Sequence, residues 1–238
     1  MGEKRETTIV PVTYEPLHQQ RWISDTVRVV GVKFPPHTTC QWHQHFQFSV
    51  YACINDLIAT EQVLNQPPRI LTQPKGSVFC RDHTQDQLVH IATSHEEPVF
   101  VVLVELLKEK QLLVPHDAVP LHVARDVMCV NDSLECRVYR ILMPIVYEDD
   151  SKDNKLSLAL STGAVLVALH ECVVLLQNHH ARKEDNSNDD NDSPQPPERM
   201  HSFQPGDDVV LEPGHLIIQL VSQLTHVNCV EFVLVEVF

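Results

Sequence analysis

The feature that most constrains the fold of this chain is an internal repeat of strand-like segments. Residues 28–35 match residues 137–144 at an offset of 109 positions, with Arg-Val at the start and proline at the end of both segments. Near the end of each half, residues 100–106 match residues 231–237 at an offset of 131 positions. A repeat of whole strand sets predicts that each half closes its own sheet.

The offset rises from 109 to about 130 along the chain, which predicts an insertion of about 21 residues in the second half. Residues 178–199 read NHHARKEDNSNDDNDSPQPPER, a polar and acidic low-complexity tract of 22 residues. Such a tract cannot bury enough apolar surface to fold. We therefore expect a disordered surface loop between two strands, in which His179 and His180 are solvated.

The rest of the chain has an all-β pattern. Short runs of Val, Ile, Leu and Phe recur between polar and proline-containing segments, and helical periodicity is not sustained. The runs predict strands over residues 27–34, 46–55, 77–81, 88–93, 99–107, 136–143, 164–176, 208–211, 216–222 and 230–237. Residues 106–111 predict one short helical turn.

The repeat and the length together predict two domains. A chain of 238 residues accommodates two domains of about 100 to 120 residues each. We expect an N-terminal arm over residues 1–20, a first barrel over 21–108, a linker over 109–126 and a second barrel over 127–238. Closing a small sheet removes its exposed edges and leaves an interior that can hold a small ligand.

Charge and hydropathy exclude several classes of partner. The net charge of −14, from 18 basic and 32 acidic side chains, predicts that the chain binds neither nucleic acid nor an anionic membrane. The first twenty residues lack the apolar run of a secretory signal. The longest apolar runs reach about nine residues, whereas a transmembrane helix needs roughly 20. We expect a soluble, cytoplasmic protein, in which the seven scattered cysteines are free thiols.

A histidine pair is the strongest candidate for a functional site. His43 and His45 are two positions apart in a predicted strand, so their side chains project from one face about 7 Å apart along the backbone. Both imidazoles can then reach one ion. Alternate residues of a strand face the same side, so Gln47, Ser49 and Tyr51 are candidates for lining a ligand. The alternative is that both histidines lie partly exposed at a barrel rim.

Two stretches around this pair resemble a known family. Residues 34–45 place a proline-rich turn before the pair, and residues 76–93 lead from a glycine through two short strands to His90. These stretches resemble the two motifs of the cupin superfamily, and the resemblance covers roughly residues 27–107. It implies that each half is a double-stranded β-helix, or jelly-roll, barrel, and that the chain is a bicupin. It also implies that His90 is a third metal ligand.

The chain departs from the family pattern at two places. The pattern has a glutamate ligand three or four residues beyond the pair, where this chain has Ser49 and Val50. The Pro-x-Gly turn of the second motif is replaced by residues 81–86, which makes His83 an alternative third ligand. No basic pair is obviously placed to bind a carboxylate, although Arg69 and Arg81 are candidates.

Three neutral imidazoles suit a divalent ion such as Fe(II), Zn, Ni or Cu and leave coordination positions open. The resemblance implies a mononuclear metal-dependent dioxygenase or a related enzyme that acts on a small molecule in the first barrel. A second interpretation is a bicupin that binds a metal or small ligand without turnover, as a sensor or storage protein. A third is an interaction protein whose acidic tract at residues 178–199 binds a basic partner.

The second half resembles the family without its ligands. Residues 206–215 include the Pro-x-Gly turn, but the third-ligand position falls near Ile217 or Ile218. At an offset of 109, the histidine pair corresponds to Lys152 and Asn154. We therefore expect a degenerate second barrel that serves a structural role or forms a homodimer.

Overall fold

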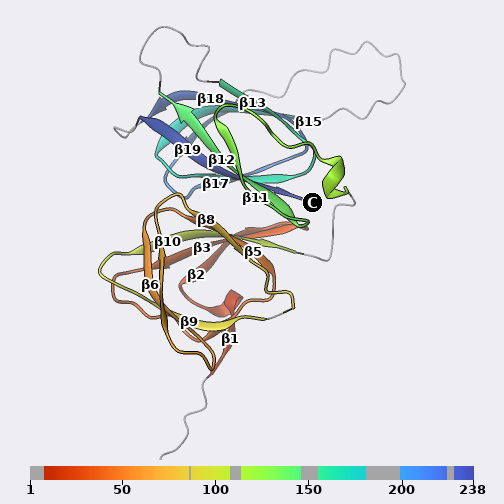
Figure 1. Cartoon of the computed structure of the whole chain (residues 1–238). Coiled ribbons are helices and arrows are strands. Elements are labelled where there is room, and N and C mark those ends of the chain that lie inside the picture. Colours follow the sequence, from red (N-terminus) through yellow and green to blue (C-terminus); the bar gives the residue numbers. More distant parts are fainter. Residues whose placement is uncertain (1–7, 86, 108–113, 146–154, 181–198, 224–227) are drawn as a thin grey trace, which may run out of the picture. The chain divides into compact units, whose positions relative to one another are not determined.

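The computed structural model describes residues 8–85, 87–107, 114–145, 155–180, 199–223 and 228–238 (Figure 1). These residues form strands and two single-turn 3-10 helices, Val12–Tyr14 and His116–Ala118. The chain divides into two compact units, Met1–Gln111 and Leu112–Phe238. Over the described ranges, no helix has the length and hydropathy needed to cross a bilayer.

Unit 1 consists of two five-stranded sheets that pack face to face. One sheet has the order β1-β4-β9-β6-β7 and the other β2-β3-β10-β5-β8. The strands are β1 (Val10–Pro11), β2 (His18–Ile23), β3 (Val27–Phe34), β4 (His43–Gln44), β5 (Phe48–Cys53), β6 (Leu57–Val63), β7 (Arg69–Gln73), β8 (Val78–Arg81), β9 (Val89–Ser94) and β10 (Val99–Leu106). The inward-facing apolar residues of both sheets form the core, which includes Val30, Val32, Phe34, Leu57, Val101 and Leu103.

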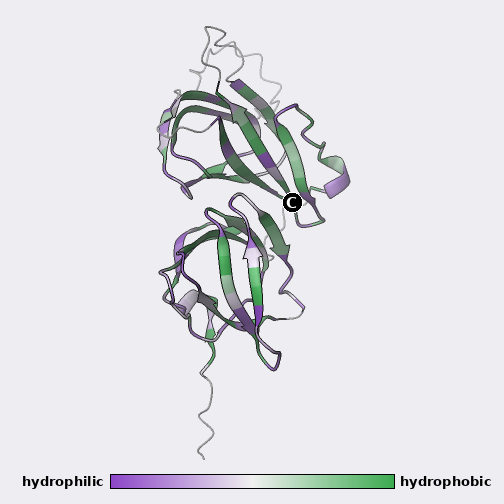
Figure 2. Ribbon diagram, turned by 60° about the vertical axis from the view of Figure 1, so that its left-hand side comes forward, coloured by the Kyte–Doolittle hydropathy of each residue, from purple (hydrophilic) through white to green (hydrophobic). Residues whose placement is uncertain are grey.

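Unit 2 repeats this architecture. Its sheets have the orders β11-β12-β19-β14-β17 and β13-β18-β15-β16. The strands are β11 (Val127–Asp132), β12 (Cys136–Pro144), β13 (Lys155–Leu160), β14 (Ala164–Ala168), β15 (Cys172–His180), β16 (Arg199–Phe203), β17 (Asp208–Leu211), β18 (Gly214–Gln223) and β19 (Cys229–Val237). Figure 2 shows hydrophobic residues along the strands of both units and hydrophilic residues in many of the connections.

The registers of the two units confirm the duplication. Val27 pairs with Leu106 between β3 and β10, and Cys136 pairs with Val237 between β12 and β19. These pairs lie at the offsets of 109 and 131 that the sequence repeat gives. The turns before β8 and β17 also correspond, since Gly76 and Gly206 both adopt positive φ, at 76° and 86°. Residues with a Cβ rarely adopt this conformation, so a glycine is required in each turn.

Two predicted elements of unit 2 are wrong in their bounds. The predicted strand 164–176 is two strands, β14 and β15, which lie in different sheets. The residues on either side of the bend are apolar and buried, and neither glycine nor proline marks it. The predicted loop 178–199 begins later, because Asn178, His179 and His180 end β15, and Arg199 begins β16. Residues 181–198 lie outside the described residues, and so do residues 108–111 of the predicted helical turn.

Candidate metal centre

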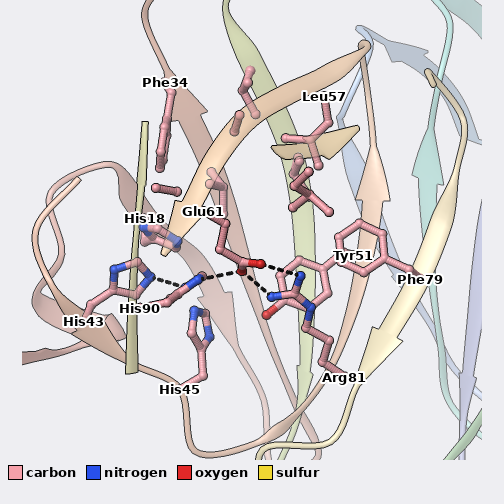
Figure 3. Close-up of a pocket in the computed structure, with 16 residues that line it drawn as sticks. His18, Phe34, His43, His45, Tyr51, Leu57, Glu61, Phe79, Arg81 and His90 are labelled. Atoms are coloured by element: carbon pink, nitrogen blue, oxygen red, sulfur yellow. Dashed lines mark hydrogen bonds and ion pairs between the residues drawn. The ribbon is translucent and has the colours of Figure 1, made fainter. Parts of the chain in front are cut away.

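Pairing between β4 and β9 brings the predicted histidines together inside unit 1. His43 lies directly opposite His90 in the register, and His45 follows β4 before the chain bends at Gln47 into β5 of the other sheet. The ring centroids of His43 and His90 are 4.4 Å apart, and the ring of His45 lies 5.1 and 5.2 Å from them. Figure 3 shows the three rings at one pocket, and all three residues are buried.

Hydrogen bonds fix the tautomers of two of these rings. The Nδ1 atom of His43 lies 2.8 Å from the carbonyl oxygen of Gln41, and the Nδ1 atom of His90 lies 2.8 Å from Oε1 of Glu61. Both oxygens only accept, so each Nδ1 donates, and each Nε2 of a neutral ring carries a lone pair. The two Nε2 atoms are nevertheless 2.9 Å apart. Two lone pairs at this distance repel each other unless a proton or a metal ion lies between them.

The distance between these nitrogens also fits an ion. Two ligands at right angles around an ion, each with a bond of about 2.1 Å, are separated by about 3.0 Å. A buried imidazole whose Nδ1 donates to a carboxylate or a backbone carbonyl is the usual arrangement of a metal-bound histidine in proteins.

His45 points to the same conclusion by a different observation. The residue is fully buried, and neither of its ring nitrogens has a hydrogen-bond partner among the described residues. Its Nδ1 lies 3.7 Å from Glu105 Oε1, an atom that also has no hydrogen-bond partner among the described residues, although the other oxygen of Glu105 is paired with Arg28. Leaving a buried polar group unsatisfied costs about 1–3 kcal/mol. An ion at Nε2 would satisfy this ring.

The cluster contains a fourth histidine, which the sequence did not predict. His18 on β2 lies with its ring centroid 4.5 Å from that of His43, and one nitrogen each of His18, His43 and His45 lie within 4.8 Å of one another. The Nδ1 atom of His18 lies 2.6 Å from Oε2 of Glu15, which is itself buried. His18 falls in the predicted N-terminal arm. The sequence repeat could have revealed this residue. The predicted second barrel begins at Val127, which corresponds to His18 at the offset of 109 positions, so the first barrel should begin at His18 rather than at residue 21.

Glu61 on β6 is a second residue that the sequence did not predict. Its carboxylate accepts hydrogen bonds from His90, from Arg69 Nη2 at 2.7 Å and from Arg81 Nη1 at 2.6 Å. Burial would raise the pKa of this carboxyl group, but the bonds from His90, Arg81 and Arg69 outweigh it and hold the pKa well below the ordinary value. The two candidate carboxylate-binding arginines are thus paired with a carboxylate of the chain itself.

Burial holds three histidines of the cluster, His43, His45 and His90, in the neutral form. Burial, together with the neighbouring imidazoles, lowers the pKa of His43 to about 2. Burial also lowers the pKa of His45 and of His90. Neutral imidazole is the form that donates a lone pair to a metal ion, so no proton has to leave these rings near pH 7.

The other predicted residues occupy different positions around the pocket. His83 is buried, but its Nε2 lies 3.2 Å from the hydroxyl of Tyr51. Tyr51 lines the pocket, whereas Gln47 lies at the bend and Ser49 donates to the carbonyl oxygen of Gln47 at 3.0 Å. Contact of Gln47 or Ser49 with a ligand stays a prediction.

A largely apolar pocket adjoins the histidines. Its cavity volume is about 70 Å³. The residues that line it are His18, Val32, Phe34, His43, His45, Tyr51, Leu57, Ala59, Glu61, Leu71, Phe79, Arg81, His90, Ala92, Val99 and Val101. A small molecule that enters this pocket can therefore approach the imidazoles along apolar walls.

Unit 2 has apolar residues at the equivalent positions. β13 pairs with β18 as β4 pairs with β9, and Leu158 lies opposite Leu216 where His43 lies opposite His90. The same registers place Leu160, Leu176 and Val127 at the positions of His45, Glu61 and His18. All five belong to the core of unit 2.

These registers correct the alignment based on the sequence. The equivalents of His43 and His45 are Leu158 and Leu160, six positions beyond the predicted Lys152 and Asn154. Lys152 and Asn154 themselves lie outside the described residues. The third equivalent is Leu216, rather than Ile217 or Ile218. The error arose because part of the insertion precedes β13, whereas the sequence placed all of it at residues 178–199.

Comparisons with known proteins agree with this architecture. No family model matches the chain, and a search of curated proteins gives no match. Among solved structures, AerE from Microcystis aeruginosa aligns with a TM-score of 0.54 and 8% identity over 94% of this chain and 98% of that chain. YhaK from Escherichia coli aligns at 0.52 and 10% identity over 92% and 87% of the two chains.

A structure described as a cupin 2 conserved barrel domain protein from Leptotrichia buccalis aligns at a TM-score of 0.51 and 7% identity, over 93% of this chain and 88% of that chain. At such identities the likeness concerns the fold alone. The alignments span both units, and the strand orders of the units repeat. The chain therefore has the fold of two tandem cupin-type barrels.

Proposed function

We propose that the first barrel binds one divalent transition-metal ion through His43, His45 and His90, with His18 as a fourth donor. The observation that carries this proposal is the 2.9 Å separation of two Nε2 atoms whose rings already donate from Nδ1. The unpartnered nitrogens of His45 support it independently.

The donor set favours ions that accept imidazole nitrogen. Fe(II), Zn, Ni and Cu all suit such ligands, whereas Mg and Ca prefer oxygen. An ion that accepts five or six ligands keeps positions free beside the four imidazoles. A bound ion would act there as a Lewis acid toward a small molecule.

The chain's own residues would keep this centre in order. Glu15 and Glu61 hold the rings of His18 and His90 by hydrogen bonds at 2.6 and 2.8 Å. The apolar walls of the pocket exclude water, which strengthens electrostatic interactions inside it. A pocket beside the donor set favours an oxygenase or a related small-molecule enzyme over a storage protein.

Elemental analysis tests the metal site. The purified wild-type protein should contain about one equivalent of a transition metal, and a His43→Ala, His45→Ala double variant should contain none. A matched control is a His37→Ala, His95→Ala variant, which removes two histidines of the same unit that do not line the pocket. Equal metal content in the first pair of proteins would refute the site and leave the interaction-protein interpretation.

Oxygen consumption separates an enzyme from a binding protein. The iron-loaded wild-type protein, supplied with small thiols or enediols, should consume oxygen, and the metal-free double variant should not. Metal binding without oxygen consumption would favour the sensor or storage interpretation.

A further inference from the structure

The charges around the histidine cluster are nearly balanced without a metal ion. Three buried carboxylates surround it, Glu15, Glu61 and Glu105. Glu61 is paired with Arg81, whose side chain is 19% exposed, and Glu105 is paired with Arg28. Each of these two pairs is neutral, or positive where the carboxyl group is protonated.

The remaining charges do not neutralise a divalent ion. Glu15 carries one negative charge, and Arg69 carries one positive charge but is 62% exposed. Imidazoles bind a metal ion in their neutral form and so add no charge to the site. An ion of charge 2+ therefore leaves a net charge of at least about +1 in an apolar cavity, and an unpaired charge is costly to bury.

Arg81 places the positive end of one of these pairs at the wall of the pocket. The residue lines the pocket, and its Cζ lies 5.5 and 5.7 Å from the ring centroids of Phe79 and Tyr51. Its two Nη atoms bind Glu61. The guanidinium group is thus held at the pocket beside the carboxylate that binds His90, close to the place where an ion would lie (Figure 3).

The rest of the pocket is suited to apolar atoms of a ligand rather than to charged ones. The walls beyond the imidazoles are apolar and come from both sheets, and Figure 3 shows Phe34 and Leu57 on the side away from His45 and Arg81. Burying apolar atoms of a ligand against such walls stabilises a complex.

We infer that the ligand of this centre is a small organic anion of the carboxylate class, whose charged end binds at the ion and whose apolar body lies against these walls. This inference rests on the metal site proposed above. An anion with a short apolar chain satisfies both the excess positive charge and the apolar walls, whereas a neutral alcohol or an inorganic anion satisfies only one of them.

The test uses the full chain loaded with Co(II), whose visible spectrum responds to a change of ligand. Butyrate, 1-butanol and acetate are titrated into the loaded and the metal-free protein. Butyrate should change the spectrum and bind at least tenfold more tightly than 1-butanol. It should also bind more tightly than acetate, because acetate lacks two methylene groups. Metal-free protein should show no measurable butyrate binding by calorimetry.

A pair of variants that differ only in charge provides the matched control. Ala92 lines the pocket, lies opposite Glu61 in the register and is two positions from His90. Ala92→Asp brings a negative charge into the pocket and should take the place of the ligand anion, whereas Ala92→Asn has nearly the same shape without the charge. At equal cobalt content, the Asp variant should bind butyrate at least tenfold more weakly than the Asn variant.

The outcomes separate the two proposals. If cobalt binds and 1-butanol competes equally with butyrate, the anionic ligand class is wrong while the metal site stands. Equal butyrate binding to the metal-free protein, or to the Asp and Asn variants, overturns the inference in the same way. If no cobalt binds at the histidines, both proposals fail.

Discussion

Leu158 lies opposite Leu216 in unit 2 in the same register that places His43 opposite His90 in unit 1. The same position of one fold thus holds a packed apolar pair in one copy and two converging imidazoles in the other. The leucines contribute to stability by burial, whereas the two imidazoles bring their Nε2 atoms within 2.9 Å of each other. Substitutions at these equivalent positions should therefore have different effects on stability and on metal content in the two units.

Truncating the leucine pair should destabilise unit 2. Leu216 is completely buried in its core. We expect Leu216→Ala to lower the free energy of unfolding by about 2–5 kcal/mol, because it removes buried methyl groups and leaves a cavity. Denaturant unfolding measures this change, and metal content should stay unchanged. A loss of metal in this variant would contradict the assignment of the site to unit 1 alone.

Exchanging the imidazoles for leucines should have the opposite effects, because metal binding should be lost and stability retained. A His43→Leu, His90→Leu variant should bind no metal, yet its metal-free form should unfold at the same denaturant concentration as metal-free wild type or a higher one. Replacing two facing polar groups by apolar ones removes the repulsion between lone pairs and keeps the volume filled. Strong destabilisation of this variant would show that the histidines are structural without metal.

Glu61 should control metal affinity without being a ligand. Glu61→Gln removes the charge that holds Nδ1 of His90, and losses of 10–100-fold in metal affinity are typical for such partners. Competition with a chelator measures the loss. Glu97→Gln, at an exposed position of the same unit, is the control and should have wild-type affinity. If Glu61→Gln also has wild-type affinity, the carboxylate does not orient the ring.

The two further histidines should differ in their effect on the metal. His18→Ala should weaken binding at least tenfold because a donor is lost, whereas His83→Phe should leave the metal stoichiometry unchanged, since His83 is paired with Tyr51. Elemental analysis and chelator competition measure both. Loss of the metal in His83→Phe would make His83 the third ligand and refute the arrangement described above.

Acid should destabilise the metal-free protein through the buried histidines. The pKa of His43 is lowered to about 2, below its ordinary value of 6.5, so the unfolded chain binds more protons than the folded one between these values. Stability is then complete above about pH 6.5 and falls as the pH drops below it, by up to about 1.4 kcal/mol per pH unit for one such histidine.

Denaturant unfolding of metal-free protein between pH 7.5 and 4.5 measures this dependence. The His43→Leu, His90→Leu variant should show a shallower loss over the same range, because two of the buried titrating groups are absent. An identical slope in the two proteins would show that these rings do not carry the acid sensitivity.

Sequence patterns predicted the strands that are defined by the residues of a single short segment. The bounds of β3 and β17 agree with the predicted segments 27–34 and 208–211, because both are short apolar runs between polar turns. The pair His43 and His45 was recognisable from its spacing, and His90 from the resemblance to the cupin motifs. The structure places the ring centroids of these three residues 4.4 to 5.2 Å apart, and their role as metal ligands stays a prediction.

The residues that were missed depend on contacts between strands. β6 reads Leu-Ile-Ala-Thr-Glu-Gln-Val, and its polar end hid both the strand and Glu61, whose role appears only through pairing with β9. His18 was hidden because β2 is mostly polar and half-exposed. A side chain whose function lies in a partner some thirty positions away, as with Glu61 and His90, leaves no periodic signal in a single sequence.

The most direct measurement is a crystal structure of the metal-loaded protein with an anomalous difference map at the absorption edge of the metal. The predicted result is one peak per chain, about 2.1 Å from Nε2 of His43, His45 and His90, with no peak among the leucines of unit 2. A map without a peak between these three nitrogens, or with its peak elsewhere in the chain, would contradict the metal centre.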